Sequence, residues 1–239
     1  MRSSAHLPSP LRLACAVAAL AATSCTAQIH SPQINIHRKP APEDLSWLWQ
    51  YTQPGPGNRE NELIGDPRFK ALLKQNLTAP QSFWETNKPL SDVALEFLAV
   101  PGDVTGDENR YVSVTGCVPH FCPSRGLLWV DLGLAHPLIV FNAIDWIKEN
   151  RATVDKGAAY ALWIFPNRVL NPEHPPDALI RSIARWTSQP SPGSTELQNI
   201  TRVFLVDPDG TPHPVTPSAI GAHNNLPAET TTGMETKVQ

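Results

Sequence analysis

The stretch GCVPHFCPS, residues 116–124, holds most of the side chains in this chain that could carry chemistry. Two cysteines, Cys117 and Cys122, enclose four residues that include Pro119 and His120. Such a segment could be half of a metal site, a redox centre, a turn that is merely stapled, or a rigid binding loop. The rest of the sequence narrows this choice.

The first two of these chemistries lack the residues that they need. Zinc accepts Cys and His ligands, but a structural site needs four of them and the chain has no second Cys pair. Redox catalysis requires a C-x-x-C at a helix start, where one thiol becomes reactive, and here four residues separate the cysteines. Nucleophilic hydrolysis has no G-x-S-x-G elbow, and neither Ser113 nor Ser124 has an evident base-and-acid pair. We therefore expect a protein that is not an enzyme and that has no cofactor and no metal.

The N-terminus reads as an export signal over residues 1–27. Arg2 and Arg12 accompany the apolar run LACAVAALAA, which is shorter than the about 20 residues of a membrane-spanning helix. Two processing routes fit: cleavage after Ala27, or lipidation of Cys25, because LAATSC resembles a bacterial lipobox. We expect a periplasmic or secreted protein that reaches a membrane only through a lipid on Cys25.

Export also determines the state of the cysteines. Cys15 leaves with the signal, and Cys25 is either removed or acylated. Cys117 and Cys122 are then the remaining thiols, in a compartment that permits disulfides. We predict that they are paired.

Charge and length exclude one class of partner and favour one domain. The chain of 239 residues has 19 basic and 22 acidic side chains, a formal net charge of −3. Without Arg2 and Arg12, 17 basic residues remain and the net charge is −5. A mildly acidic exported protein is a poor binder of nucleic acid, so we expect none as partner. About 200 mature residues are enough to bury a core.

The chain after the signal divides into three segments. Residues 28–62 are a Pro-rich extension in which APEDLSWLWQY predicts a short helix, whose aromatic cluster we expect to pack on its own core. Residues 63–222 form the main domain, with helices predicted from Asp66, as N-cap, to Leu77 and from Pro176 onward. Residues 223–239 show no apolar period and predict a disordered tail.

Five apolar runs in the main domain predict a sheet. They cover residues 92–100, 110–117, 126–132, 137–144 and 159–165. The turn-rich stretch PGDVTGDEN, the cysteine loop and GLAH separate most of them, and short connections favour antiparallel pairing. IDWIKENRA predicts a helical or irregular crossover, and TRVFLVDPDGTPHPV predicts one more strand and turn. The expected fold is α+β: an antiparallel five-stranded meander flanked by helices, with a disulfide-closed protruding loop.

The loop between the cysteines should be stiff. Pro119 fixes its own φ and restricts Val118 before it. A disulfide over so few residues adds little global stability, but it limits the conformations of the tip, which lowers the ordering cost of binding. We expect the tip to present His120 with Val118 and Phe121 beside it. The alternative is equally compatible with these residues: the disulfide only fixes the end of a hairpin, and His120 is solvated.

The sequence YVSVTGCVPHFC, followed by GLLWVDLG and PLIVFNAI, resembles the family of inhibitors of vertebrate lysozyme, the Ivy family. That family has a strand, a C-K-P-H-D-C loop and an apolar strand pair. Cys117, Pro119, His120 and Cys122 match the loop. Val118 replaces the lysine and Phe121 the aspartate. The likeness covers about residues 66–165.

The resemblance implies a function and a partner. In the family the loop enters the lysozyme cleft, and its histidine contacts the two catalytic carboxylates. This implies inhibition of a muramidase through Cys117–Cys122 and His120, with c-type lysozyme the first candidate partner and a lytic transglycosylase the second. A homodimer is also compatible with the sequence. The changes at Val118 and Phe121 remove polar contacts and leave a different target open.

A second hypothesis is a non-catalytic envelope scaffold or binding protein. It would have kept this fold without inhibiting lysozyme. The Pro-rich flanks and the aromatic residues 47–51 would then bind a cell-wall or membrane partner. Truncation of the N-terminal extension would distinguish the two hypotheses, because inhibition should survive it and docking should not.

Overall fold

The computed structural model describes residues 44–52, 59–85, 87–147 and 158–224, which belong to one compact unit. The elements follow in the order η1 (Ser46–Tyr51), α1 (Arg59–Gly65), α2 (Pro67–Asn76), α3 (Leu90–Phe97), β1 (Val100–Asp107), β2 (Tyr111–Val118), β3 (Phe121–Asp131), β4 (Leu138–Trp146), β5 (Ala159–Pro166), α4 (Asp177–Thr187), β6 (Asn199–Val206), β7 (Pro212–Val215) and η2 (Pro217–Ile220). The predicted signal and lipidation site lie outside the described residues, as do residues 225–239 of the predicted tail and most of the crossover.

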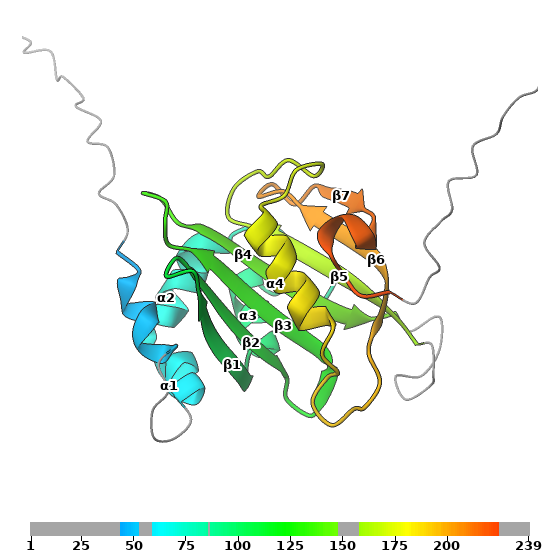
Figure 1. The fold of residues 1–239 in the computed structure, drawn as a ribbon, viewed down its shortest axis with the longest axis horizontal. Coiled ribbons are helices and arrows are strands. Elements are labelled where there is room, and N and C mark those ends of the chain that lie inside the picture. Colours follow the sequence, from blue (N-terminus) through cyan, green and yellow to red (C-terminus); the bar gives the residue numbers. More distant parts are fainter. Residues whose placement is uncertain (1–43, 53–58, 86, 148–157, 225–239) are drawn as a thin grey trace, which may run out of the picture. The chain divides into compact units, whose positions relative to one another are not determined.

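These strands form one sheet in sequence order, β1 to β7 (Figure 1). All neighbours pair antiparallel except β5 and β6, which are parallel. The α+β class is confirmed, but the expected five-stranded, wholly antiparallel sheet is wrong. A parallel pair needs a long crossover connection, and α4 is part of the connection between β5 and β6.

The predicted first strand is also wrong, because residues 90–97 form helix α3. Its buried apolar side chains, Leu90, Val93, Ala94 and Phe97, recur at the spacing of a helix face. The true first strand, β1, is the stretch that predicted a turn. Only its end turns, at Glu108 and Asn109, whose φ values of 54° and 49° match a tight hairpin.

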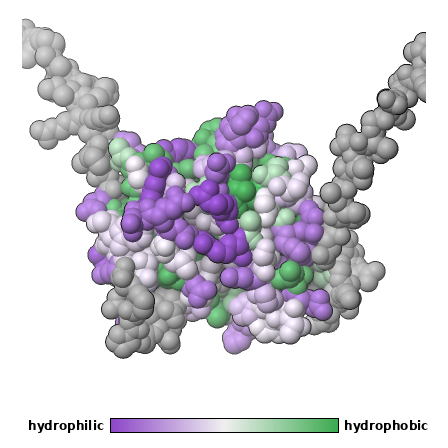
Figure 2. Space-filling model, viewed as in Figure 1, coloured by the Kyte–Doolittle hydropathy of each residue, from purple (hydrophilic) through white to green (hydrophobic). Residues whose placement is uncertain are grey.

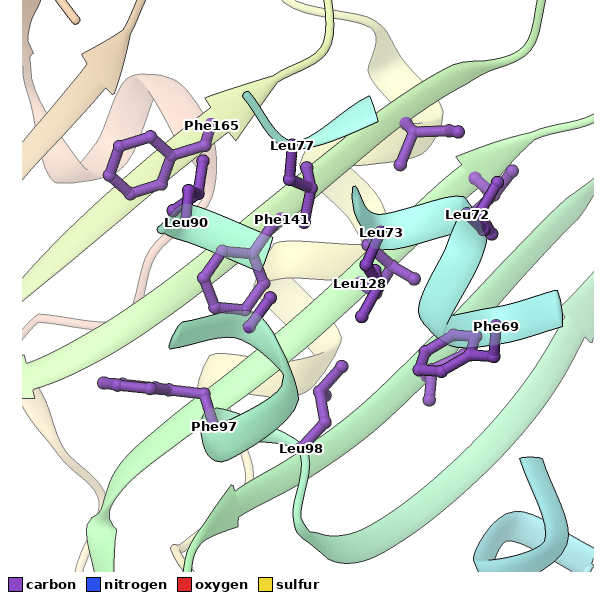
Figure 3. Packing of buried hydrophobic residues seen from close by; sticks show 14 of the residues in the cluster. Phe69, Leu72, Leu73, Leu77, Leu90, Phe97, Leu98, Leu128, Phe141 and Phe165 are labelled. Carbon is purple, nitrogen blue, oxygen red and sulfur yellow. The ribbon is translucent and has the colours of Figure 1, made fainter. Parts of the chain in front are cut away.

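Helices cover both faces of the sheet (Figure 1). On one face η1, α1, α2 and α3 enclose a core whose aromatic members include Phe69, Phe97, Phe141 and Phe165 (Figure 3). On the other face α4 packs over Trp129 with Leu179 and Ile183. Because both faces are covered, β3 is buried almost continuously from Ser124 to Asp131 rather than in alternation.

Several local predictions are confirmed. The Asp66 side chain caps α2 by accepting a hydrogen bond from the Arg68 N–H at 2.8 Å. The helix predicted after Pro176 is α4, and the C-terminal strand and turn are β6 with β7. β7 lies at the edge of the sheet, where Pro212 and Pro214 are tolerated.

The aromatic segment before α1 belongs to the core. Leu45 and Leu48 are buried in the same cluster as α2 and α3, and Trp47, Trp49 and Tyr51 pack against it. This confirms that the cluster packs on its own domain. The part of the predicted extension that includes η1 therefore helps to stabilise the sheet.

Candidate functional site

Strands β2 and β3 are joined by a hairpin whose tip is Pro119 and His120. The predicted disulfide between Cys117 and Cys122 is present, with their Cα atoms 4.9 Å apart. Val118 and Phe121 face each other as the last pair of the ladder. The disulfide thus joins the residue before Val118 to the residue after Phe121, next to the pair that flanks the two-residue turn.

The backbone of the tip depends on these two residue types. His120 has φ of 62°, a left-handed conformation that few side chains other than Gly, Asn, Asp and His adopt readily. Proline before such a residue gives the combination found in type II turns, since proline holds φ near −65°. These residue types therefore favour this turn, and the turn sets the direction of the Cα–Cβ bond of His120.

The exposed part of the loop is narrower than expected. Pro119 and His120 are exposed, but Val118 is only 6% exposed and packs into the core with α2 and α3. Phe121 is half-buried, and its ring lies 6.2 Å from that of Trp146 on β4. Val118, which we expected to be a contact at the tip, therefore lies in the core.

The base of the loop is held by a buried arginine that sequence inspection did not single out. Arg125 pairs with Cys117 across the strands and donates from Nε to Oε1 of Gln198 at 2.5 Å. The Gln198 amide donates in turn to the Pro123 carbonyl at 2.6 Å. Gln198 thus connects the segment before β6 to the residue that follows Cys122.

This arginine is a cation in an unusual setting. Its guanidinium lies over the ring of Trp186 on α4, 5.1 Å from the centroid. Burial lowers the pKa of Arg125 to about 10, so it stays charged at neutral pH. Among the described residues no partner lies within hydrogen-bonding distance of its Nη2 atom. The sequence gives little sign of the Arg125–Gln198 hydrogen bond, because the two residues are 73 positions apart.

A second contact fixes the start of β3. Ser124 donates its hydroxyl to Oδ1 of Asp145 at 3.0 Å, and the Trp146 N–H donates to the same oxygen at 2.8 Å. Ser124 is therefore part of the support of the loop. Since its hydroxyl is completely buried, it is not accessible as a nucleophile.

Two histidines of the described residues, His136 and His213, lie away from the loop. His136 lies in the β3–β4 turn at the other end of β3, and His213 contacts Asp207 at 2.9 Å on the β6–β7 hairpin. Among the described residues no three His, Cys, Asp or Glu side chains gather as a metal site would require. The chemistry that the loop offers is one exposed imidazole on a rigid support, which can donate and accept hydrogen bonds.

Comparisons with known proteins identify no family for this chain. Within the described part of the chain, no helix has both the length and the apolar character that a membrane span requires. No known family model, no curated protein and no solved structure matches the chain.

Proposed function

We propose that this chain is an exported inhibitor of lysozyme-like muramidases. The Cys117–Cys122 hairpin inserts into the active-site cleft of the target, and His120 is its central contact. The inhibitor itself performs no catalysis. The observation that carries the proposal is an exposed histidine with positive φ at the tip of a hairpin that a disulfide closes.

The expected target chemistry suits such a tip. A glycosidase of this type uses a carboxylic acid and a carboxylate on either side of the bond that it cleaves. An imidazole placed between them can donate hydrogen bonds to both and occupy the position of the substrate.

Rigidity supports affinity for a physical reason. A flexible loop loses conformational entropy when a partner orders it, and this loss subtracts from the binding free energy. Here the Gln198 contacts and the buried Val118 support the loop from below, in addition to the disulfide. Phe121, resting on Trp146, would widen the contact beyond the histidine.

The experiment that tests the proposal measures turnover of cell-wall substrate by a c-type lysozyme at increasing concentrations of this protein. We expect inhibition by the oxidised protein and a loss of at least about tenfold in potency after reduction and alkylation of Cys117 and Cys122. A lytic transglycosylase is assayed in parallel as the second candidate target. Failure of the oxidised protein to inhibit either enzyme at micromolar concentration would contradict the proposal.

A shorter chain distinguishes the scaffold hypothesis from the inhibitor proposal. Because Leu45 and Leu48 are core residues, the truncation should remove only the residues before Ala41. The proposal predicts that this shorter chain inhibits as well as the longer one. A chain that never inhibits, and that loses a cell-wall or membrane partner on this truncation, would favour a scaffold that binds through its N-terminal Pro-rich flank.

A further inference from the structure

A hollow of about 790 Å³ lies between the end of α2 and the start of α3. Its lining includes Leu77 and Leu90, which also belong to the core cluster (Figure 3). Polar side chains that line it include Lys74, Ser91 and Asp92. The volume lies within the range of about 300–1,000 Å³ that is typical of sites for small molecules.

The segment that joins the two helices is braced by Gln81. Its Nε2 atom donates to the carbonyl oxygens of Glu85 at 3.1 Å and Lys88 at 2.7 Å. Its Oε1 atom accepts a hydrogen bond from the Trp84 N–H at 3.2 Å. These contacts support the backbone that leads into α3, so less ordering is needed when a ligand binds there.

Helix α3 begins with donors that have no partner among the described residues. Pro89, the residue before it, supplies no side-chain cap, and its carbonyl accepts from the N–H groups of Asp92 and Val93. The N–H groups of Leu90 and Ser91 form no hydrogen bond within the described part of the chain. Free N–H groups and the helix dipole together favour an anion at such an end.

Ser91 adds a hydroxyl at the same place. It is only 7% exposed and lines the hollow, and its hydroxyl forms no hydrogen bond with any of the described residues. Its Oγ atom is not sealed from solvent. Buried hydroxyls are normally paired, because an unpaired one loses hydration without compensation. The Ser91 hydroxyl is therefore available as a donor to a group bound in the hollow.

Lys74 supplies the positive charge. Its side chain is exposed, lines the hollow and forms no ion pair with the described residues. Lys88 also lines the hollow, but it forms ion pairs with Glu85, at 3.3 Å, and with Glu96. The carboxylate of Asp92, in the first turn of α3, is the opposing charge on the lining.

The two arginines of α4, on the opposite face of the sheet, are already matched by acids. Arg181 forms an ion pair with Glu108 at 2.7 Å, and Arg185 forms one with Asp107. Figure 2 shows hydrophilic side chains gathered over this part of the surface. An anion would have to displace these carboxylates, whereas the donors at the start of α3 are unoccupied by protein groups.

We propose that the hollow binds a small organic acid through its carboxylate or phosphate group. The anionic group accepts hydrogen bonds from the N–H groups of Leu90 and Ser91 and from the Ser91 hydroxyl, and Lys74 supplies a compensating charge. The rest of the ligand rests on Leu77 and Leu90. Asp92 repels the anion and weakens its binding. The site is distinct from the hairpin tip and does not depend on the inhibitory function.

The test is a titration of the ¹⁵N-labelled protein at constant ionic strength, followed by amide chemical shifts. The probes are benzoate, glycerol 3-phosphate and inorganic phosphate, with sodium chloride and glucose as controls. We expect saturable shifts at Leu90 and Ser91 with at least one of the three anions and with neither control. Saturation with benzoate alone identifies a carboxylate ligand, and saturation with the two phosphates alone identifies a phosphate ligand.

Variants with opposite expected effects separate binding from folding. Ser91→Ala and Lys74→Gln should each weaken binding of the anion at least about threefold, because each removes a group that contacts or attracts it. Asp92→Asn should strengthen binding at least about twofold, because it removes a like charge. Lys70→Gln is the matched control, at an exposed lysine of α2 that does not line the hollow.

Three results would overturn the proposal. They are no saturation with any of the three anions, equal shifts with chloride or glucose, and wild-type affinity in both Ser91→Ala and Lys74→Gln. A Lys70→Gln variant that loses as much affinity as Lys74→Gln would likewise overturn it, because the effect would then reflect the overall charge of the protein.

Discussion

Val118 and His120 lie two residues apart in the hairpin and have opposite roles. The residue types predict a stiff turn, because proline and a histidine with positive φ define its backbone. They do not predict which side chains point outward. Val118 lies at a register shift in the β2–β3 ladder, and helices cover both faces of the sheet, so the usual alternation of buried and exposed positions fails there.

The burial of Val118 leads to a stability prediction. Val118→Ala should lower the free energy of unfolding by about 2 kcal/mol, because it removes buried methyl groups from the core. Val169→Ala is the control, at a side chain that is 69% exposed, and should change stability by less than about 0.5 kcal/mol. Urea unfolding measures both. Equal values for the two variants would place Val118 at the surface.

Asp66 gives the clearest pH dependence. Hydrogen bonds from Arg68, and a smaller contribution from the Tyr51 hydroxyl, lower the pKa of Asp66 well below its usual range despite its burial. A carboxyl whose pKa is lower in the folded state stabilises the fold above its ordinary pKa near 4, and this stabilisation is lost as the pH falls through the folded value.

Asp66→Asn tests this charge, since asparagine still caps a helix. We expect the variant to be less stable than the wild type by about 1–2 kcal/mol at pH 7. The difference should shrink between pH 5 and pH 3, because Asp66 of the unfolded wild type, with an ordinary pKa near 4, is protonated over this range while the folded carboxylate stays ionised. The measurement is urea unfolding at pH 7, 5 and 3, and a difference that is constant over this range would exclude the ionised carboxylate as its source.

At the scale of elements, helices with a cap signal were predictable and strand β1 was not. Asp66 and Pro67 mark the start of α2, and Pro176 with Asp177 marks that of α4. Residues 92–100 are apolar enough to read as a strand, but their burial follows a helical period. The Gly- and Asp-rich β1 has weak strand propensity and is formed by its pairing with β2 at the sheet edge.

The segment η1 shows where the stable domain begins. Leu48 is completely buried, so Leu48→Ala should lower the free energy of unfolding by about 2–4 kcal/mol. A chain that starts at Ala41 keeps this residue and should unfold with the same midpoint as the longer chain. Thermal and urea unfolding check both statements. An unchanged Leu48→Ala midpoint would show that η1 contributes nothing to the core.

At the scale of the whole molecule, the support of the hairpin comes from residues far apart in the sequence. The disulfide was predictable because the predicted export signal would leave two nearby cysteines in a compartment that permits disulfides. The Arg125–Gln198 contact was not, because it requires the parallel β5–β6 pair and the crossover through α4 to bring the segment before β6 beside β3. Local patterns predict the tip, whereas tertiary packing determines what holds it.

The most direct measurement compares the inhibition constants of three forms of the protein against c-type lysozyme: wild type, His120→Asn and His136→Asn. Asparagine tolerates the positive φ at position 120, so that variant keeps the turn and removes only the imidazole. His136 is an exposed histidine in the β3–β4 turn and is the matched control. We predict that the wild type and His136→Asn inhibit equally and that His120→Asn is at least about tenfold weaker. Equal inhibition by all three forms, or none by the wild type at micromolar concentration, would contradict the account.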